Sequence, residues 1–220
     1  MSGVLADRLR LIVVTDPDCG AGRQVVDVVR AALRGGAPAI QLRMKDASAR
    51  AMAEAARALR VETRAAGALL FINDRVDVAL AAGADGAHVG QDDLPVAAAR
   101  EIAPPGFLLG ASAETAELAR AAQNDGADYV GVGPVYVTGS KADAGDAVGV
   151  ERIAVVRDAV HIPVVGIGGI TVENAPPVLA AGAAGVAVIG AVMRAADPEA
   201  AARALLGGRY RISGIERVTS

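Results

Sequence analysis

Short apolar runs alternate with longer amphipathic segments along most of the chain. The runs are rich in Val, Ile and Leu and have the length expected of strands buried on both faces. They lie at Leu11–Val14, Ala39–Leu42, Leu69–Ile72, Gly86–Val89, Phe107–Gly110, Tyr129–Val132, Val164–Ile167 and Gly185–Ile189. Helices are predicted near Gln24–Arg34, Ser48–Ala66, Arg75–Ala82, Pro95–Ile102, Ala113–Asn124, Val150–Ala159, Asn174–Ala181 and Pro198–Leu206. Eight strand and helix pairs predict an α/β fold, the (β/α)8 TIM barrel.

A repeated dipeptide supports this order of elements. A Gly-Ala pair stands between a predicted helix and the next strand at Gly36-Ala37, Gly83-Ala84, Gly126-Ala127 and Gly182-Ala183. Glycine at a helix C-terminus adopts the left-handed conformation without a Cβ penalty, and the small alanine allows a tight turn into the sheet. These joints predict that the amino ends of the strands have a structural role.

A doubly wound open sheet is the competing architecture. Such a sheet normally carries a glycine-rich phosphate turn after its first strand. Here that position holds Asp16-Pro17-Asp18-Cys19-Gly20, and the densest glycine cluster comes late, at Gly166-Ile167-Gly168-Gly169. A phosphate site after the seventh and eighth strands is typical of barrels, so the glycine distribution favours the barrel.

The 220-residue length suits one barrel domain, which we assign to residues 1–206, with residues 207–220 as a C-terminal extension without a clear pattern. Hydrophobic residues make up 53% of the chain and aromatic residues 2%, so the core must consist mainly of Ala, Val, Leu and Ile. A net charge of −3 disfavours binding to nucleic acid or to an anionic membrane. Any bound phosphate must therefore be held by local groups.

The only cysteine, Cys19, excludes an internal disulfide and a Cys-rich metal site. No run approaches the roughly 18 apolar residues of a membrane span, and the first ten residues do not resemble a signal sequence. We therefore expect a soluble, cytoplasmic protein.

Polar residues at the predicted strand ends are the candidates for chemistry, because barrel enzymes build their sites there. After the second strand, Gln41, Arg43 and Lys45 alternate and so share one face of an extended segment. They predict either a cationic cradle for a diphosphate or a solvated loop that begins at Asp46. The spacing alone does not decide between the two.

Carboxylates follow the third and fourth strands, in Asn73-Asp74 and in Gln91-Asp92-Asp93. Taken singly, such residues are usually helix caps or turn residues. Neighbouring strands lie about 4.8 Å apart, however, so Asp74 and Asp93 could share one hard cation. Mg²⁺, which prefers oxygen ligands and accompanies phosphates, is the natural candidate.

Hydroxyl and backbone groups follow the later strands. Ser112 could donate to a phosphate oxygen, although a helix cap is the simpler interpretation. Thr138, Ser140 and Lys141 form either an oxyanion site on a lid or part of a surface loop. Gly169 and Gly190 leave backbone N–H groups open to a phosphate. In contrast, His88 is interpreted as a hydrogen-bonded core residue, without a catalytic role.

Together these residues resemble the thiamine-phosphate synthase family from about Leu11 to Leu206. The resemblance rests on five blocks in order, which are Gln41-Leu42-Arg43-Met44-Lys45, Phe71-Ile72-Asn73-Asp74-Arg75, His88-Val89-Gly90-Gln91-Asp92-Asp93-Leu94-Pro95, Gly133-Pro134-Val135-Tyr136 with Thr138-Gly139-Ser140-Lys141, and Ile167-Gly168-Gly169-Ile170. The family often has Pro where this chain has Val137, and Ser where it has Gly190.

The resemblance implies a transferase that joins 4-amino-5-hydroxymethyl-2-methylpyrimidine diphosphate to a thiazole phosphate, with release of pyrophosphate. It implies a pyrimidine diphosphate site formed by Gln41, Arg43, Lys45, Asn73, Ser112 and Lys141. It implies a thiazole phosphate site formed by Thr138, Ser140, Gly169, Ile189 and Gly190. Asp74 and Asp93 would hold Mg²⁺, and Arg43, Lys45 and Lys141 would act catalytically by neutralising charge on the leaving group.

Two other functions stay open at this point. A thiazole tautomerase of the same superfamily would bind the thiazole phosphate without a diphosphate, and a non-catalytic sensor would bind thiamine phosphates without turnover. The synthase is favoured because the chain keeps a full diphosphate and metal set, namely Lys45, Asn73, Asp74, Asp93 and Lys141. A homo-oligomer is possible, and the sequence does not fix the oligomeric state.

Overall fold

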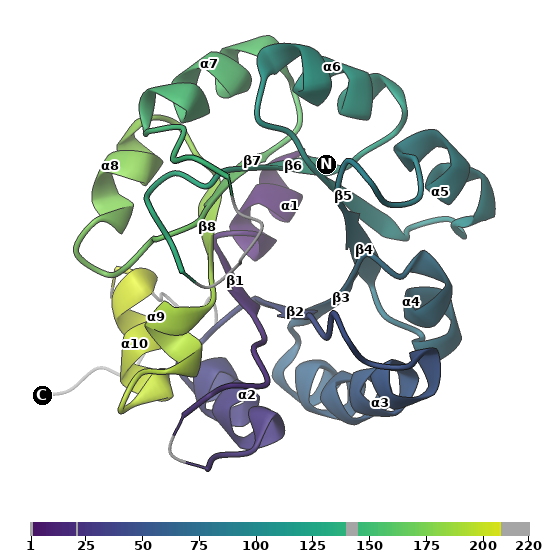
Figure 1. Cartoon of the computed structure of the whole chain (residues 1–220), viewed down its shortest axis with the longest axis vertical. Coiled ribbons are helices and arrows are strands. Elements are labelled where there is room, and N and C mark those ends of the chain that lie inside the picture. Colours follow the sequence, from purple (N-terminus) through teal and green to yellow (C-terminus); the bar gives the residue numbers. More distant parts are fainter. Residues whose placement is uncertain (1, 21, 140–144, 208–220) are drawn as a thin grey trace, which may run out of the picture.

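The computed structural model describes residues 2–20, 22–139 and 145–207, and these form a closed parallel barrel surrounded by helices (Figure 1). The strands are β1 Leu11–Val14, β2 Ala39–Leu42, β3 Leu69–Asn73, β4 Gly86–Val89, β5 Leu108–Ser112, β6 Tyr129–Val132, β7 Val164–Ile167 and β8 Gly185–Val188. The helices are α1 Ser2–Arg8, α2 Val25–Arg34, α3 Ala49–Ala66, α4 Val76–Ala82, α5 Val96–Ile102, α6 Ala116–Asn124, α7 Glu151–Ala159, α8 Ala175–Ala180, α9 Gly190–Met193 and α10 Pro198–Leu205. The predicted (β/α)8 fold is confirmed.

The strands pair in chain order, and β8 closes the ring against β1. Their residues are almost all buried, because the outer helices cover one face of each strand and the barrel interior covers the other (Figure 1). Inside the barrel, the rings of Phe71 and Tyr129 meet edge to face with centroids 5.5 Å apart. Ala, Val, Leu and Ile make up most of the remaining core, as the composition indicates.

The four Gly-Ala joints behave as the sequence predicts. Their glycines all have positive φ, with values of 94° at Gly36, 63° at Gly83, 99° at Gly126 and 98° at Gly182. Each turns the chain from a helix into the next strand at the amino end of the barrel. The same glycine turn thus recurs at the amino end of the barrel. A functional site is expected at the opposite, carboxyl end of the strands.

Two of the joints continue into an aspartate that ties a helix to the barrel. Asp85 accepts hydrogen bonds from both terminal nitrogens of Arg60, at 2.5 and 2.9 Å, and from the backbone N–H of Leu70 at 2.8 Å. Asp128 repeats the pattern with Arg100, at 2.6 Å, and with a backbone N–H of β5. These clamps fix α3 and α5 against the strands.

Two helices are additional to the predicted set. α1 precedes β1, so it lies at the amino end of the barrel, and Figure 1 shows it across the opening of the ring. Leu9, which follows α1, is fully buried, and Arg8 donates to the backbone carbonyl of Gly67 at 3.2 Å. α9 begins at Gly190, so the last strand ends at Val188 and not at Ile189 as predicted.

No helix in the described residues is long and apolar enough to span a bilayer. Of the predicted C-terminal extension, residues 208–220 lie outside the described residues.

Candidate active site

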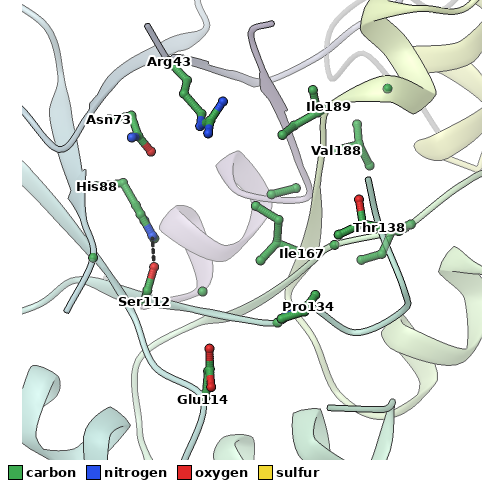
Figure 2. Close-up of a pocket in the computed structure, with 18 of the residues that line it drawn as sticks. Arg43, Asn73, His88, Ser112, Glu114, Pro134, Thr138, Ile167, Val188 and Ile189 are labelled. Carbon is green, nitrogen blue, oxygen red and sulfur yellow. Dashed lines mark hydrogen bonds between the residues drawn. The ribbon is translucent and has the colours of Figure 1, made fainter. Parts of the chain in front are cut away.

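A cavity of about 480 Å³ opens where the strands end and the following loops begin. Most of the residues predicted from the strand ends line it, namely Arg43, Lys45, Asn73, Asp74, Asp93, Ser112, Thr138, Gly169, Ile189 and Gly190. Figure 2 shows Arg43, Asn73 and Ser112 on one side of the cavity, with Thr138 and Ile189 on the other. The barrel thus brings together side chains that are far apart in the sequence.

Gln41 lies beneath the cavity wall and does not line the cavity itself. Its side chain is buried, and its Nε2 donates a 2.7 Å hydrogen bond to Oδ1 of Asn73. Oδ1 of Asn73 is thus engaged as an acceptor, and Nδ2 is the donor group of this side chain. Gln41 therefore fixes the orientation of the Asn73 amide at the cavity wall.

The position of Arg43 is fixed from the first strand. Thr15, which follows β1 and is buried, accepts a 2.9 Å hydrogen bond from the backbone N–H of Arg43 with its Oγ1. The guanidinium group extends into the cavity (Figure 2), and its Nε is buried without a hydrogen-bond partner among the described residues. Because Arg43 lines the cavity, its guanidinium group is available to an acceptor there.

Asp74 and Asp93 both line the cavity, from the ends of β3 and β4. Asp74 has a positive φ of 64°, and its backbone N–H donates to the carbonyl oxygen of His88 at 2.8 Å. Asp93 accepts a 2.7 Å hydrogen bond on Oδ2 from the backbone N–H of Gly90, which holds its carboxylate at the loop. Within the described residues, no three His, Cys, Asp or Glu side chains form a metal cluster.

Ser112 is the last residue of β5 and does not cap the next helix. The cap of α6 is Thr115, whose side chain accepts a hydrogen bond from the backbone N–H of Leu118, so the cap interpretation of Ser112 is wrong. The strand is longer than predicted, and it carries Ser112 to the cavity wall. There its Oγ lies 3.1 Å from Nε2 of His88 (Figure 2).

His88 is hydrogen-bonded as predicted, yet it also lines the cavity. Its Nδ1 lies 3.1 Å from the hydroxyl of Tyr129, a fully buried residue of β6. Burial, with a smaller contribution from the charge of Asp128, raises the pKa of the Tyr129 hydroxyl far above its usual value. Tyr129 is thus a neutral phenol inside the barrel.

The glycine pair after β7 forms a turn that is locked from two sides. Gly168 and Gly169 have φ values of 95° and 65°, which side chains rarely adopt. Asn174 donates from Nδ2 to the carbonyl oxygen of Gly169 at 2.9 Å, and the hydroxyl of Tyr136 donates to the carbonyl of Asn174 at 3.0 Å. The turn therefore presents a fixed stretch of backbone to the cavity.

Arginines from two ends of the chain hold the segment after β8. Arg23 donates to the carbonyl oxygens of Met193 and Ala195, at 3.1 and 2.8 Å, at the C-terminus of α9. Arg194 forms a 2.7 Å ion pair with the nearly buried Asp16. These contacts keep Gly190, at the start of α9, against the cavity.

The loop after β6 is anchored at its base. The backbone N–H of Val135 donates to the carbonyl of Ile167 at 2.8 Å, and that of Tyr136 donates to the carbonyl of Gly168 at 3.0 Å. Thr138 then lines the cavity. Ser140 and Lys141, and with them the predicted lid, lie outside the described residues.

Comparisons with known proteins place this arrangement in a family. The family model described as thiamine monophosphate synthase matches residues 11–192. The chain belongs to this family. It is 54% identical over 195 residues to the thiamine-phosphate synthase of Moorella thermoacetica, covering 89% of this chain and 93% of that protein. It is 56% identical over 193 residues to the thiamine-phosphate synthase of Roseiflexus castenholzii, covering 88% and 85%.

A solved structure of the family has the same fold. Thiamine phosphate pyrophosphorylase from Pyrococcus furiosus superposes with a TM-score of 0.83 at 45% identity, covering 91% of this chain and 95% of that chain. The region of this chain that the family model matches thus includes all eight strands and the cavity at their carboxyl ends.

Some cavity residues of this thiamine monophosphate synthase family member were not among the predicted site. His88 occupies an apolar strand, and only the residues opposite it show that its ring reaches the cavity. Glu114 lines the cavity from the loop after β5, where the predicted helix start concealed it. Thr15 does not line the cavity, but it holds the backbone of Arg43, and it belongs to no motif that could have marked it.

Proposed function

We propose that this chain joins 4-amino-5-hydroxymethyl-2-methylpyrimidine diphosphate to a thiazole phosphate, forming thiamine monophosphate and releasing pyrophosphate. The observation that supports this most directly is the single cavity lined by Arg43, Lys45, Asn73, Asp74 and Asp93. Such a set suits a diphosphate better than a monophosphate. The relatives from Moorella thermoacetica and Roseiflexus castenholzii carry the name thiamine-phosphate synthase, which supports the same transferase activity.

In this proposal the two substrates lie on opposite sides of the cavity. Arg43, Lys45, Asn73 and Ser112 hold the pyrimidine diphosphate, together with Lys141, while Gln41 orients Asn73. The thiazole phosphate lies against the backbone N–H groups near Gly169, Ile189 and Gly190 and the hydroxyls of Thr138 and Ser140. The locked turn at Gly169 supports this, because fixed backbone donors bind a phosphate without reorganisation.

The reaction needs little covalent participation from the protein. The bond between the pyrimidinylmethyl carbon and the diphosphate oxygen breaks, and the electron-rich aminopyrimidine stabilises the positive charge left on carbon. The thiazole nitrogen then forms the new bond to that carbon. Arg43, Lys45 and Lys141 neutralise the charge that accumulates on the diphosphate, and the barrel holds the two rings in line.

The carboxylates suit Mg²⁺, which commonly binds one or two protein carboxylates and completes its coordination with substrate phosphates and water. Asp74 and Asp93 would hold the ion, and both line the cavity that also contains the basic side chains. The ion would supply further neutralisation of the leaving diphosphate.

Purified protein, incubated with both substrates and Mg²⁺, tests the proposal directly. We expect thiamine monophosphate and pyrophosphate to form in equal amounts, as measured by chromatography and a coupled pyrophosphate assay. Isomerisation of the thiazole phosphate without pyrophosphate release would instead indicate a tautomerase. Binding of thiamine monophosphate without any turnover would indicate a sensor.

A further inference from the structure

The hydrogen bonds between Tyr129, His88 and Ser112 form a chain from the barrel core to the cavity. Tyr129 Oη lies 3.1 Å from Nδ1 of His88, and Nε2 of the same ring lies 3.1 Å from Oγ of Ser112. The glycines opposite make room for it. A Cβ at Gly110 would overlap the Tyr129 ring and Nδ1 of His88, and a Cβ at Gly131 would lie 3.1 Å from Cε1 of His88. The barrel wall is therefore shaped around this pair of rings.

The direction of the chain follows from the buried end. Within the described residues, the Tyr129 hydroxyl has one hydrogen-bond partner, Nδ1 of His88, and its high pKa keeps the phenol protonated. If Nδ1 carried a hydrogen, the phenol hydrogen would be left without an acceptor in a fully buried position. Nδ1 therefore accepts, and the neutral ring carries its hydrogen on Nε2.

The remaining step concerns Ser112, at the cavity end. Nε2–H donates to Oγ of Ser112, which leaves the hydroxyl hydrogen of Ser112 to point elsewhere. Both His88 and Ser112 line the cavity, so a ligand acceptor there is within the reach of that hydrogen. We propose that Tyr129 is a positioning residue, which fixes the His88 tautomer and thereby makes Ser112 a hydrogen-bond donor toward the bound substrate. Its effect on turnover rests on the function proposed above.

The tautomer is measurable without any substrate. The chain has two histidines, so a ¹⁵N-histidine-labelled sample gives a simple spectrum, in which two-bond ¹H–¹⁵N correlations distinguish a protonated from an unprotonated ring nitrogen. His161 has an exposed position away from the cavity, and His161→Gln assigns the signals. We expect His88 in the Nε2–H form, and we expect Tyr129→Phe to abolish that preference. An Nδ1–H form or a doubly protonated ring in the unaltered protein would overturn the proposal.

Kinetics test the link to Ser112. We expect Tyr129→Phe to lower kcat about tenfold, the size of one hydrogen bond, and to leave the KM for the thiazole phosphate unchanged. In a Ser112→Ala background the same change should lower kcat less than about twofold, because both substitutions remove one donor. Full additivity of the two effects would overturn the role through Ser112.

The two readouts separate the possible failures. If the unaltered protein shows the Nε2–H tautomer but makes no thiamine monophosphate, the hydrogen-bond chain stands and the proposed function fails. Phenylalanine keeps the ring that packs on Phe71, and thermal unfolding shows whether the variant is folded. Should Tyr129→Phe not fold, the spectrum of the unaltered protein still decides the tautomer.

Discussion

Arg43 combines a fixed backbone with a guanidinium group that lines the cavity. Its backbone is tied to Thr15, and its buried Nε lacks a partner among the described residues. The guanidinium group is planar and can bind a phosphate through two parallel hydrogen bonds, which an ammonium group cannot do. The side chain therefore suits the diphosphate-binding role proposed for it in both shape and charge.

Replacing Arg43 by Lys should separate charge from geometry. We expect Arg43→Lys to raise the KM for the pyrimidine diphosphate about tenfold, and Arg43→Ala to lower kcat/KM by about 100-fold or more. Steady-state kinetics with each substrate varied in turn measure both effects. Equal activity of the Lys variant and the unaltered protein would show that only charge matters at this position.

The two cavity carboxylates have a separate test in metal dependence. We expect Asp74→Ala or Asp93→Ala to abolish Mg²⁺-dependent turnover, because each would remove one of the two carboxylates of the proposed metal site. Titration of activity against Mg²⁺ concentration measures this. Asp125→Ala removes an exposed carboxylate at the C-cap of α6 and serves as the control for net charge. Unchanged Mg²⁺ dependence in either cavity variant would remove that residue from the metal site.

At the level of elements, ion pairs at the amino end of the barrel stabilise the fold and do not contact the cavity. The Arg60–Asp85 pair joins α3 to the start of β4 and is largely shielded, with side-chain exposures of 15% and 26%. Removing Arg60 leaves the charge of Asp85 partly desolvated and unpaired. It also releases the carboxylate that accepts the hydrogen bond from the backbone N–H of Leu70. The loss of stability on breaking this ion pair should therefore lie between that for a surface pair and that for a fully buried pair.

We expect Arg60→Met to lower the free energy of unfolding by about 2–3 kcal/mol and to leave kcat unchanged. Denaturant unfolding gives the first quantity. Arg30→Met is the matched control, because Arg30 also pairs across helices, with Glu62, but is 48% exposed, and its loss should destabilise the protein clearly less than the loss of Arg60. A loss of kcat in folded Arg60→Met would show that the two ends of the barrel are coupled.

Helices and strands were predictable where a clear apolar pattern extended over the whole element. The two short helices α1 and α9 lacked such a pattern and were missed. The eight strands and the helices between them followed from apolar runs and Gly-Ala joints. α1 was missed because its seven residues include only a short apolar face, and its burial depends on the barrel end that it covers. α9 was missed because Ile189 continues an apolar run, although its backbone has already left the strand, with ψ near −84°.

The same limit applies to the site. Strand-end residues with charged or amide side chains became candidates through their position, because parallel strands in a barrel end on one side, and the family resemblance supplied their expected roles. His88 was not, since its apolar neighbours suggest a core residue, and only Tyr129 and Ser112 from two other strands reveal where its ring lies. Side-chain direction within a strand depends on partners that the local sequence does not contain.

At the level of the whole molecule, exposed ion pairs link neighbouring helices of the outer layer. Hydrogen bonds from arginine lower the pKa of Glu62, through Arg30, and that of Glu199, through Arg34, below the usual 4.5. Because these pKa values are lower in the folded state, the stabilisation is present above about pH 4.5 and is lost as the pH falls through the folded values. The helix layer should thus loosen in acid.

We expect the melting temperature to fall as the pH is lowered below about 4.5, and to fall less steeply in the double variant Glu62→Gln, Glu199→Gln. Thermal unfolding across a pH series measures this. The difference between the two proteins should shrink at 1 M salt, where exposed pairs are screened. Identical pH profiles for the two proteins would show that other carboxylates control the acid transition.

The two sets of cavity residues come from two successive parts of the chain, so the protein could be divided into two fragments. The groups proposed for the pyrimidine diphosphate come mainly from residues 41–112, and those proposed for the thiazole phosphate come from residues 138–190. A cut in the connection after α6, between the two stretches, would leave one substrate's contacts mostly on each fragment. Neither fragment would catalyse alone, and the rate would depend on the product of the two fragment concentrations until the ring had reassembled.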